Sequence, residues 1–95
     1  MAKFGDLINK DKVLILFYSD GHNQCPSAEI VLKEIGTEFG PDLSTVKIDV
    51  EKNDVLADAL RIKSLPAFMI YKFGKMVFRK SGGIEKHELI NQLKN

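Results

Sequence analysis

The chain has 95 residues, of which 44% are hydrophobic and 28% are charged, and its formal net charge is +1. This length fits one domain, residues 1–95, with a modest hydrophobic core. The near-neutral charge gives no electrostatic basis for binding nucleic acid or a membrane surface, and no apolar run approaches the about 20 residues that cross a bilayer.

The first residues, Met1–Asp6, lack the apolar stretch and cleavage site of a signal peptide, which predicts a cytoplasmic protein. Cys25 is the only cysteine, so no disulfide can form within the chain, as is usual in a reducing compartment. A secreted form that has lost its leader and carries an added methionine is the alternative.

The N-terminal half predicts a helix, a strand and a second helix. Apolar residues at helical spacing indicate a short helix over Ala2–Asn9, and the continuous apolar run Val13–Tyr18 indicates a strand that is buried on both faces. From Pro26 onward, apolar residues recur every three or four positions, which predicts an amphipathic helix that ends near Gly36 or Gly40.

The next segment predicts a strand and a third helix. Apolar and polar residues alternate in Ser44–Val50, as in a half-buried strand. Asn53 is a suitable N-cap for a helix whose apolar residues extend to Ile62.

The C-terminal part predicts a hairpin and a last helix. Pro66–Lys72 and Lys75–Lys80 have the composition of strands, and Phe73-Gly74 between them predicts a tight turn. A glycine pair then breaks the chain before a helix over Glu85–Leu93.

This order of elements predicts an α/β sandwich around a four-stranded mixed sheet with strand order 2-1-3-4. The first two strands are expected to be parallel and joined by a right-handed crossover. The third is expected to lie antiparallel beside the first, with the fourth at an edge.

Five segments, taken in their order and spacing, resemble the thioredoxin family over Val13–Leu93. They are Phe17–Cys25 in place of the family's Phe-Trp-Ala-x-Trp-Cys-Gly-Pro-Cys, Val46–Val50 as its second core strand, Ile62–Phe68 leading into its cis-proline, Lys72–Lys75 as its hairpin turn, and Gly82 as the glycine that faces its active site. The resemblance implies a thioredoxin-like three-layer sandwich with helices on both faces of the sheet. The family's first strand is expected to be missing, because the residues before Val13 have a helical pattern.

The departures from the family pattern all concern its chemistry. They are His22 for the attacking cysteine, Asn23 and Gln24 for the Gly-Pro spacer, Gly21 and Tyr18 for the two tryptophans, and Leu16 for the buried acid. Cys25 matches the resolving cysteine. Dithiol exchange needs one thiol to attack and another to resolve the mixed disulfide, so we expect no efficient reduction of disulfides in the ordinary thioredoxin manner.

The reactivity of Cys25 has two interpretations. A buried thiol in apolar surroundings would be inert and act as a small hydrophobic side chain. Alternatively, Pro26 makes Cys25 the N-cap of the following helix, in a more open position, and a protonated His22 within reach would lower the pKa of the thiol. A solvated loop histidine without a role is the alternative for His22.

Metal binding and cofactors are not expected. His22 and Cys25 are suitable zinc or copper donors, but a structural zinc takes four ligands, so two copies of the chain would have to share the ion.

A binding surface is implied by the resemblance even without redox chemistry. The Leu65–Pro66 bond is expected to be cis, and the backbone of Leu65 would pair with an extended peptide from a protein partner. Gly21, Asn23, Gln24 and Gly82 complete this partner-binding set. The open edge Ser44–Val50 invites pairing with another chain, so the protein is expected to be a monomer or a weak dimer.

The sequence therefore predicts a thioredoxin-like protein of thiol redox homeostasis with at most monothiol chemistry at Cys25, supported by His22. In the enzyme version, an external thiol such as glutathione resolves the adduct. The alternative is a redox-inactive module that binds a peptide or protein through the Ser19–Gln24 loop and the Pro66 turn. A third possibility is a subunit of a larger assembly that uses the open edge strand.

Overall fold

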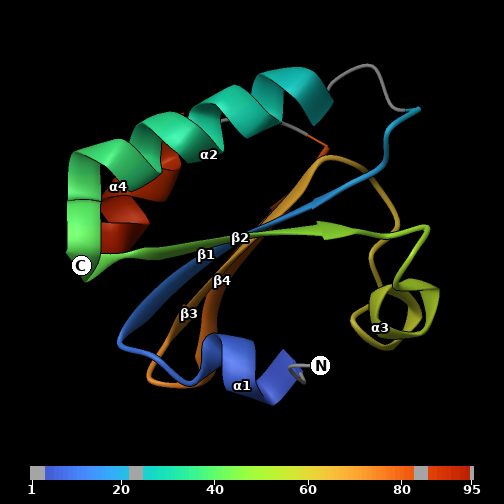
Figure 1. Cartoon of the computed structure of the whole chain (residues 1–95), viewed down its shortest axis with the longest axis horizontal. Coiled ribbons are helices and arrows are strands. Elements are labelled where there is room, and N and C mark those ends of the chain that lie inside the picture. Colours follow the sequence, from blue (N-terminus) through green and yellow to red (C-terminus); the bar gives the residue numbers. More distant parts are fainter. Residues whose placement is uncertain (1–3, 22–24, 83–85, 95) are drawn as a thin grey trace.

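The computed structural model describes residues 4–21, 25–82 and 86–94. Its elements are α1 (Phe4–Ile8), β1 (Lys12–Tyr18), α2 (Cys25–Phe39), the short 3-10 turn η1 (Gly40–Asp42), β2 (Ser44–Asp49), α3 (Asp54–Ala59), β3 (Ala67–Lys72), β4 (Lys75–Ser81) and α4 (Lys86–Lys94). The sheet forms the middle layer, with α2 and α4 on one face and α1 and α3 on the other (Figure 1). None of the helices in the described part of the chain is long and apolar enough to cross a membrane.

The sheet has the order β2-β1-β3-β4, as predicted. β1 pairs parallel with β2 and antiparallel with β3, and β4 pairs antiparallel with β3. The five residues Val13–Phe17 are 0% exposed, because β1 is a central strand that is covered on both faces. The prediction of a doubly buried strand from a continuous apolar run is confirmed.

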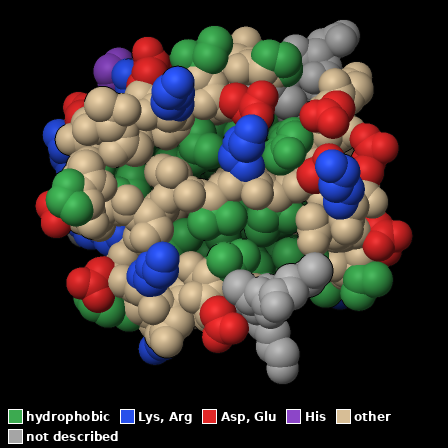
Figure 2. Space-filling model, viewed as in Figure 1, with side chains coloured by type: hydrophobic (Ala, Val, Ile, Leu, Met, Phe, Trp, Pro, Cys, Tyr) green, Lys and Arg blue, Asp and Glu red, His purple; other side chains and the backbone are tan. Residues whose placement is uncertain are grey.

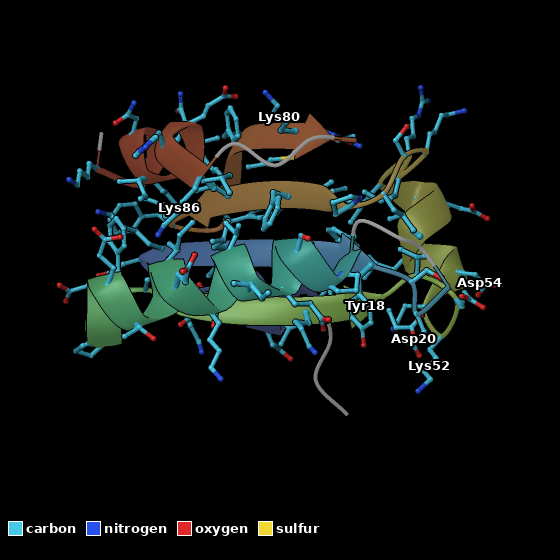
Figure 3. All side chains as sticks on the ribbon, turned by 90° about the horizontal axis from the view of Figure 1, so that it is seen from above. Tyr18, Asp20, Lys52, Asp54, Lys80 and Lys86 are labelled. Carbon is cyan, nitrogen blue, oxygen red and sulfur yellow. The ribbon has the colours of Figure 1, made fainter. Side chains whose placement is uncertain are left out.

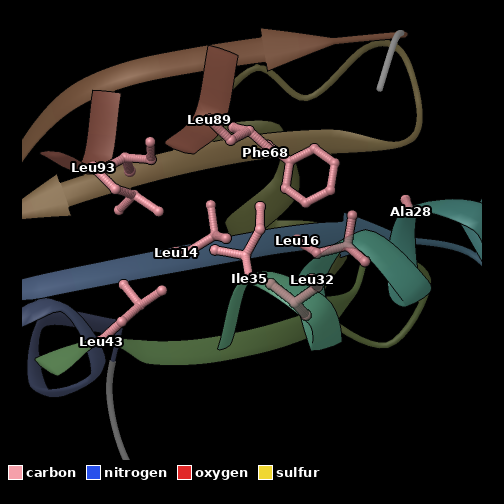
Figure 4. Packing of buried hydrophobic residues seen from close by; sticks show 10 residues of the cluster. Leu14, Leu16, Ala28, Leu32, Ile35, Leu43, Phe68, Leu89 and Leu93 are labelled. Carbon is pink, nitrogen blue, oxygen red and sulfur yellow. The ribbon is translucent and has the colours of Figure 1, made fainter. Parts of the chain in front are cut away.

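Successive side chains of the central strands pack alternately into two hydrophobic cores. The core on the α2 and α4 face contains Leu14, Leu16, Ala28, Leu32, Ile35, Leu43, Phe68, Ile70, Leu89 and Leu93 (Figure 4). The core on the α1 and α3 face contains Val13, Ile15, Phe17, Ile48, Ala67, Met69 and Tyr71. Because successive side chains of a strand point to opposite faces of the sheet, the same strands contribute apolar side chains to both helical layers.

Helix α2 differs slightly from its predicted limits. It includes Cys25 as its first helical residue, so Pro26 is its second residue and not its first. It continues through Gly36 and ends at Phe39, before Gly40 with a φ of +63°. A Cβ atom at Gly36 would lie 3.1 Å from Cγ2 of Thr45, so glycine lets the helix lie close to β2 without interrupting it.

Helix α3 is shorter than predicted, because it ends at Ala59 and Ile62 lies beyond it. Arg61 takes the left-handed conformation with a φ of 57°, and the N–H of Ile62 donates to the carbonyl of Ala57 at 3.0 Å. This pair of features is a Schellman ending, which satisfies carbonyl groups of the last turn. The helical spacing of apolar residues extends beyond the end of α3, because Ile62 still packs against the core on the α1 and α3 face of the sheet.

Asn53 precedes α3 as predicted, but its side chain does not cap the helix. Its amide group donates instead to the carbonyl oxygen of Asp49 at 3.0 Å. The hairpin turn is as predicted: Phe73 and Gly74 have φ angles of 54° and 81°, the two positive values of a type I′ turn.

Candidate functional site

The site lies at one end of the sheet, where the chain enters or leaves all four strands. The register pairs Phe17 of β1 with both Ile48 of β2 and Ala67 of β3, and it pairs Ala67 with Ser81 of β4. The segments that follow β1, β2 and β4 and the segment that precedes β3 therefore meet at this end. The predicted site residues are far apart in the sequence, and the sheet register brings their segments together.

Pro66 and Gly82 are in direct contact at this end. The N–H of Gly82 donates to the carbonyl oxygen of Pro66 at 2.9 Å, and Gly82 has a left-handed φ of +79°. The Leu65–Pro66 bond is cis. Pro66 is buried, and Leu65 is half-buried against the core on the α1 and α3 face.

Helix α2 begins at this end of the sheet with Cys25, after β1 and the exposed turn at Gly21. A helix N-terminus carries a partial positive charge, which favours the thiolate form of a cysteine placed there. His22, Asn23 and Gln24 lie outside the described residues.

Leu16, which the sequence resemblance sets in place of a buried acid, has no group that could carry a proton. It is 0% exposed and belongs to the core on the α2 and α4 face, so it offers only apolar contact. Its register partner in β2 is Lys47, whose Nζ lies 2.5 Å from Oε1 of Glu29 on α2. The same Nζ lies 5.2 Å from the centre of the Tyr18 ring.

The Glu29–Lys47 pair also sets the electrostatics beside α2. The hydrogen bond from Lys47 to Glu29 raises the pKa of Lys47, and the smaller effect of burial acts in the opposite direction. The lysine is therefore a fixed cation that covers one side of Tyr18, where it forms a cation–π contact.

Residues that sequence reasoning missed shape the loop after β2. The carboxylate of Asp49 is nearly buried and accepts the N–H of Glu51 at 2.8 Å, and Ser19 donates its hydroxyl to the carboxylate of Glu51. Tyr18, Asp20 and Asp54 lie around the same end of the molecule (Figure 3). An aspartate at the end of a strand was the available signal, because Asp side chains accept backbone N–H groups two residues on.

No group of three or more His, Cys, Asp or Glu side chains in the described ranges is arranged to hold a metal ion.

Comparison with known protein families matches residues 1–95 to the family Thioredoxin. Thioredoxin Y from rice chloroplasts (Oryza sativa subsp. japonica) is 32% identical over 96 residues, which is 99% of this chain and 57% of that protein. A thioredoxin-like protein from Synechocystis is 30% identical over 94 residues, 97% of this chain and 90% of that protein. The chain thus spans little more than half the length of the plant relative.

Solved structures agree with this assignment. Oxidized mitochondrial Thioredoxin 3 from Saccharomyces cerevisiae superposes with a TM-score of 0.85 at 26% identity, over 96% of this chain and 85% of that one. A mutant thioredoxin from Halobacterium salinarum gives a TM-score of 0.83 at 26% identity, over 95% of this chain and 79% of that one. The sheet order, the position of Cys25 at the start of α2 and these matches together show that the chain belongs to the thioredoxin family.

Proposed function

We propose that the protein acts in thiol redox homeostasis through monothiol chemistry at Cys25. The observation that carries this proposal is the place of the chain's only cysteine, at the first residue of α2 and at the sheet end where Pro66 meets Gly82. The N-terminus of a 15-residue helix favours a thiolate, and the thiolate is the nucleophile in thiol–disulfide exchange.

The proposed reaction uses glutathione as the second thiol. The Cys25 thiolate attacks one sulfur of a disulfide in a protein partner, forms a mixed disulfide and releases the other sulfur as a thiolate. A glutathione thiolate then attacks the Cys25 sulfur and releases the partner as a thiol. A second glutathione frees Cys25 and leaves as oxidised glutathione, so two glutathione molecules supply the two electrons.

Two features support a monothiol role over dithiol exchange. With one cysteine, the chain has no internal thiol to resolve a mixed disulfide. Leu16 replaces the family's proton-carrying acid and is fully buried among apolar side chains. In this proposal His22 lowers the pKa of the Cys25 thiol when it is protonated.

Alkylation of the thiol tests the proposal. The rate of iodoacetamide reaction with the native protein, measured against pH, is expected to give a thiol pKa below the ordinary value of about 8.5. His22→Gln is expected to move that pKa back toward the ordinary value. A thiol that reacts only after denaturation would overturn the proposal.

Turnover provides a second test. We expect the protein to reduce a glutathionylated protein with glutathione as the electron donor, and Cys25→Ser to abolish this activity. Reduction of insulin with dithiothreitol is expected to be far slower than with a thioredoxin that has both cysteines. Equal insulin turnover would contradict the monothiol assignment.

A redox-inactive binding module is the second candidate, and one observation favours it. The backbone of Leu65 takes part in none of the hydrogen bonds that join the described residues, although it directly precedes the buried Pro66. Unpaired backbone groups beside a sheet can pair with an extended peptide of a protein partner. Gly21, Asn23, Gln24 and Gly82 would complete this surface.

Partner capture separates the two candidates. If a partner is held through sulfur, Cys25→Ser and reducing agents both abolish its capture. If it is held by backbone pairing, capture persists in Cys25→Ser and is lost when Leu65→Pro removes the backbone N–H.

The cellular location belongs to the same proposal. We place the protein in the cytoplasm, where a glutathione pool keeps thiols reduced. Relatives of the chain include chloroplast proteins, so fractionation of cells that express the full native gene product is the test.

A further inference from the structure

β2 is a regular, open edge of the sheet. No described strand lies on its outer side, and its register with β1 is unbroken from Ser44 to Asp49. The opposite edge differs, because the pairing of β3 with β4 shifts between Ile70 and Tyr71. Irregularities of that kind protect an edge from pairing with another chain, and β2 has none.

The surface around β2 is also incompletely covered. Figure 2 faces this edge and shows hydrophobic side chains on both sides of a strip of backbone. On the α2 side, a hollow of about 530 Å³ opens between helix and strand, and Glu29, Ile30, Thr45 and Lys47 are among its lining residues. A further strand beside β2 would cover both bands.

The free backbone groups of this edge can be assigned. The N–H of Val50 donates to the carbonyl of Tyr18 in β1 at 2.9 Å. Because backbone groups of successive residues point to opposite sides of a strand, the N–H and C=O groups of Thr45, Lys47 and Asp49 face outward. The carbonyl of Asp49 already accepts the side-chain amide of Asn53, which leaves Thr45 and Lys47 available.

We propose that a second copy of this chain pairs with β2, antiparallel and about a two-fold axis at Val46. This register sets Val46 opposite Val46 of the second copy and Thr45 opposite Lys47 of the second copy. Each Thr45–Lys47 pair exchanges both of its backbone hydrogen bonds, so the register uses the two available residues and no others.

Neighbouring registers are less favourable. A shift toward Asp49 sets Lys47 directly opposite Lys47 of the second copy, where like charges repel, and it needs the occupied carbonyl of Asp49. A shift toward Ser44 needs the N–H of Leu43, which already donates to Gly40. The register centred on Val46 avoids both.

The balanced charges of this edge suit a second copy as the occupant. In this register Lys47 of the second copy lies opposite Thr45, beside the hollow that also contains the carboxylate of Glu29. Lys47 already pairs with Oε1 of Glu29 in its own chain at 2.5 Å, so pairing of two copies brings two such ion pairs together as one network of two cations and two anions. The net charge of +1 adds little repulsion between copies.

Sedimentation equilibrium of the native chain, Lys47→Pro and Lys47→Ala tests whether two copies associate through β2. The native chain is expected to rise in mass from 10.7 kDa toward twice that value between about 10 μM and 1 mM. Lys47→Pro removes the outward N–H and spares the ladder with β1, and it is expected to weaken association roughly tenfold or more relative to Lys47→Ala, which removes the side chain alone. A constant mass of 10.7 kDa, or equal association of the two variants, would overturn the proposal.

Cross-linking tests the register and does not depend on a proline variant that folds. In a Cys25→Ser background, Val46→Cys places two thiols opposite each other across the two-fold axis, at a separation that a disulfide can span. Val77→Cys on the exposed face of β4 is the matched control. Val46→Cys is expected to form disulfide dimers at least about tenfold faster, because pairing holds its thiols at a millimolar effective concentration. Equal rates would overturn the register.

Discussion

Gly82 donates its backbone N–H to the carbonyl oxygen of Pro66 at 2.9 Å, and this bond joins the end of β4 to the start of β3 at the candidate site. The bond needs the chain to turn sharply after Ser81, which Gly82 does with a φ of +79°. A glycine of this kind holds the Pro66 turn in place without contributing a side chain.

Substitution of Gly82 by alanine is expected to lower the free energy of unfolding by about 1–2 kcal/mol, because the left-handed conformation is strained for a residue with a Cβ atom. The space itself is open, since a Cβ atom would lie 3.8 Å from Cβ of Ser64. Gly5→Ala is the control, because nothing lies within 4 Å of its Cβ position and no strain arises in helix α1. Urea denaturation measures the free energy of unfolding of both variants. Equal losses in the two variants would contradict the claim that the left-handed φ of Gly82 requires glycine.

Restoring an acid at Leu16 is expected to destabilise the fold. Leu16→Asp places a carboxyl group at a fully buried position in the core on the α2 and α4 face, which should cost about 3 kcal/mol or more at pH 7. Burial raises the pKa of such a carboxyl group, so the variant should regain stability as pH falls toward the ordinary aspartate value of about 3.9. Leu16→Asn, which has a similar size and cannot ionise, is the control. A constant difference between the two variants from pH 7 to about pH 4 would contradict this account.

Ionisation of Tyr71 is expected to lower the free energy of unfolding at high pH. Burial raises the pKa of its phenol above 10.0, with a smaller opposing effect of Arg79. A group whose pKa is higher in the folded protein than in the unfolded chain contributes its full stabilisation below the unfolded pKa. This contribution is lost as pH rises through the folded pKa. From about pH 10 upward, unfolding free energy should therefore fall more steeply in the native protein than in Tyr71→Phe. Parallel curves would show that Tyr71 ionises as easily in the folded chain as in the unfolded one.

The pair formed by Glu29 and Lys47 is expected to contribute little to stability. Both side chains are partly exposed, so Glu29→Gln should lower the free energy of unfolding by less than about 1 kcal/mol, and by less again in 1 M salt. Glu29 raises the pKa of Lys47 above 10.5, so this contribution is complete below that pH and is lost above it. A double-mutant cycle with Lys47→Met measures the coupling, and a value that does not change with salt would contradict the exposed geometry.

The sequence by itself determined the elements that depend on local pattern. The apolar run Val13–Phe17 is the doubly buried strand, because only a central strand of a helix-covered sheet hides every side chain. The alternating Val46 and Ile48 lie on the α1 and α3 face, and the periodic spacing after Pro26 forms α2. The sheet order followed from these elements and the handedness of their connections.

Only the tertiary structure decided features that depend on backbone partners distant in the sequence. The end of α3 at Ala59, the hydrogen bond from Asn53 to Asp49 and the meeting of Pro66 with Gly82 are examples. Periodicity reports which side chains avoid water, and it carries no information on which distant carbonyl an N–H will find or which residue will turn left-handed. Those choices are made when the strands pair, and they place the start of α2 and the Pro66 turn at one end of the sheet.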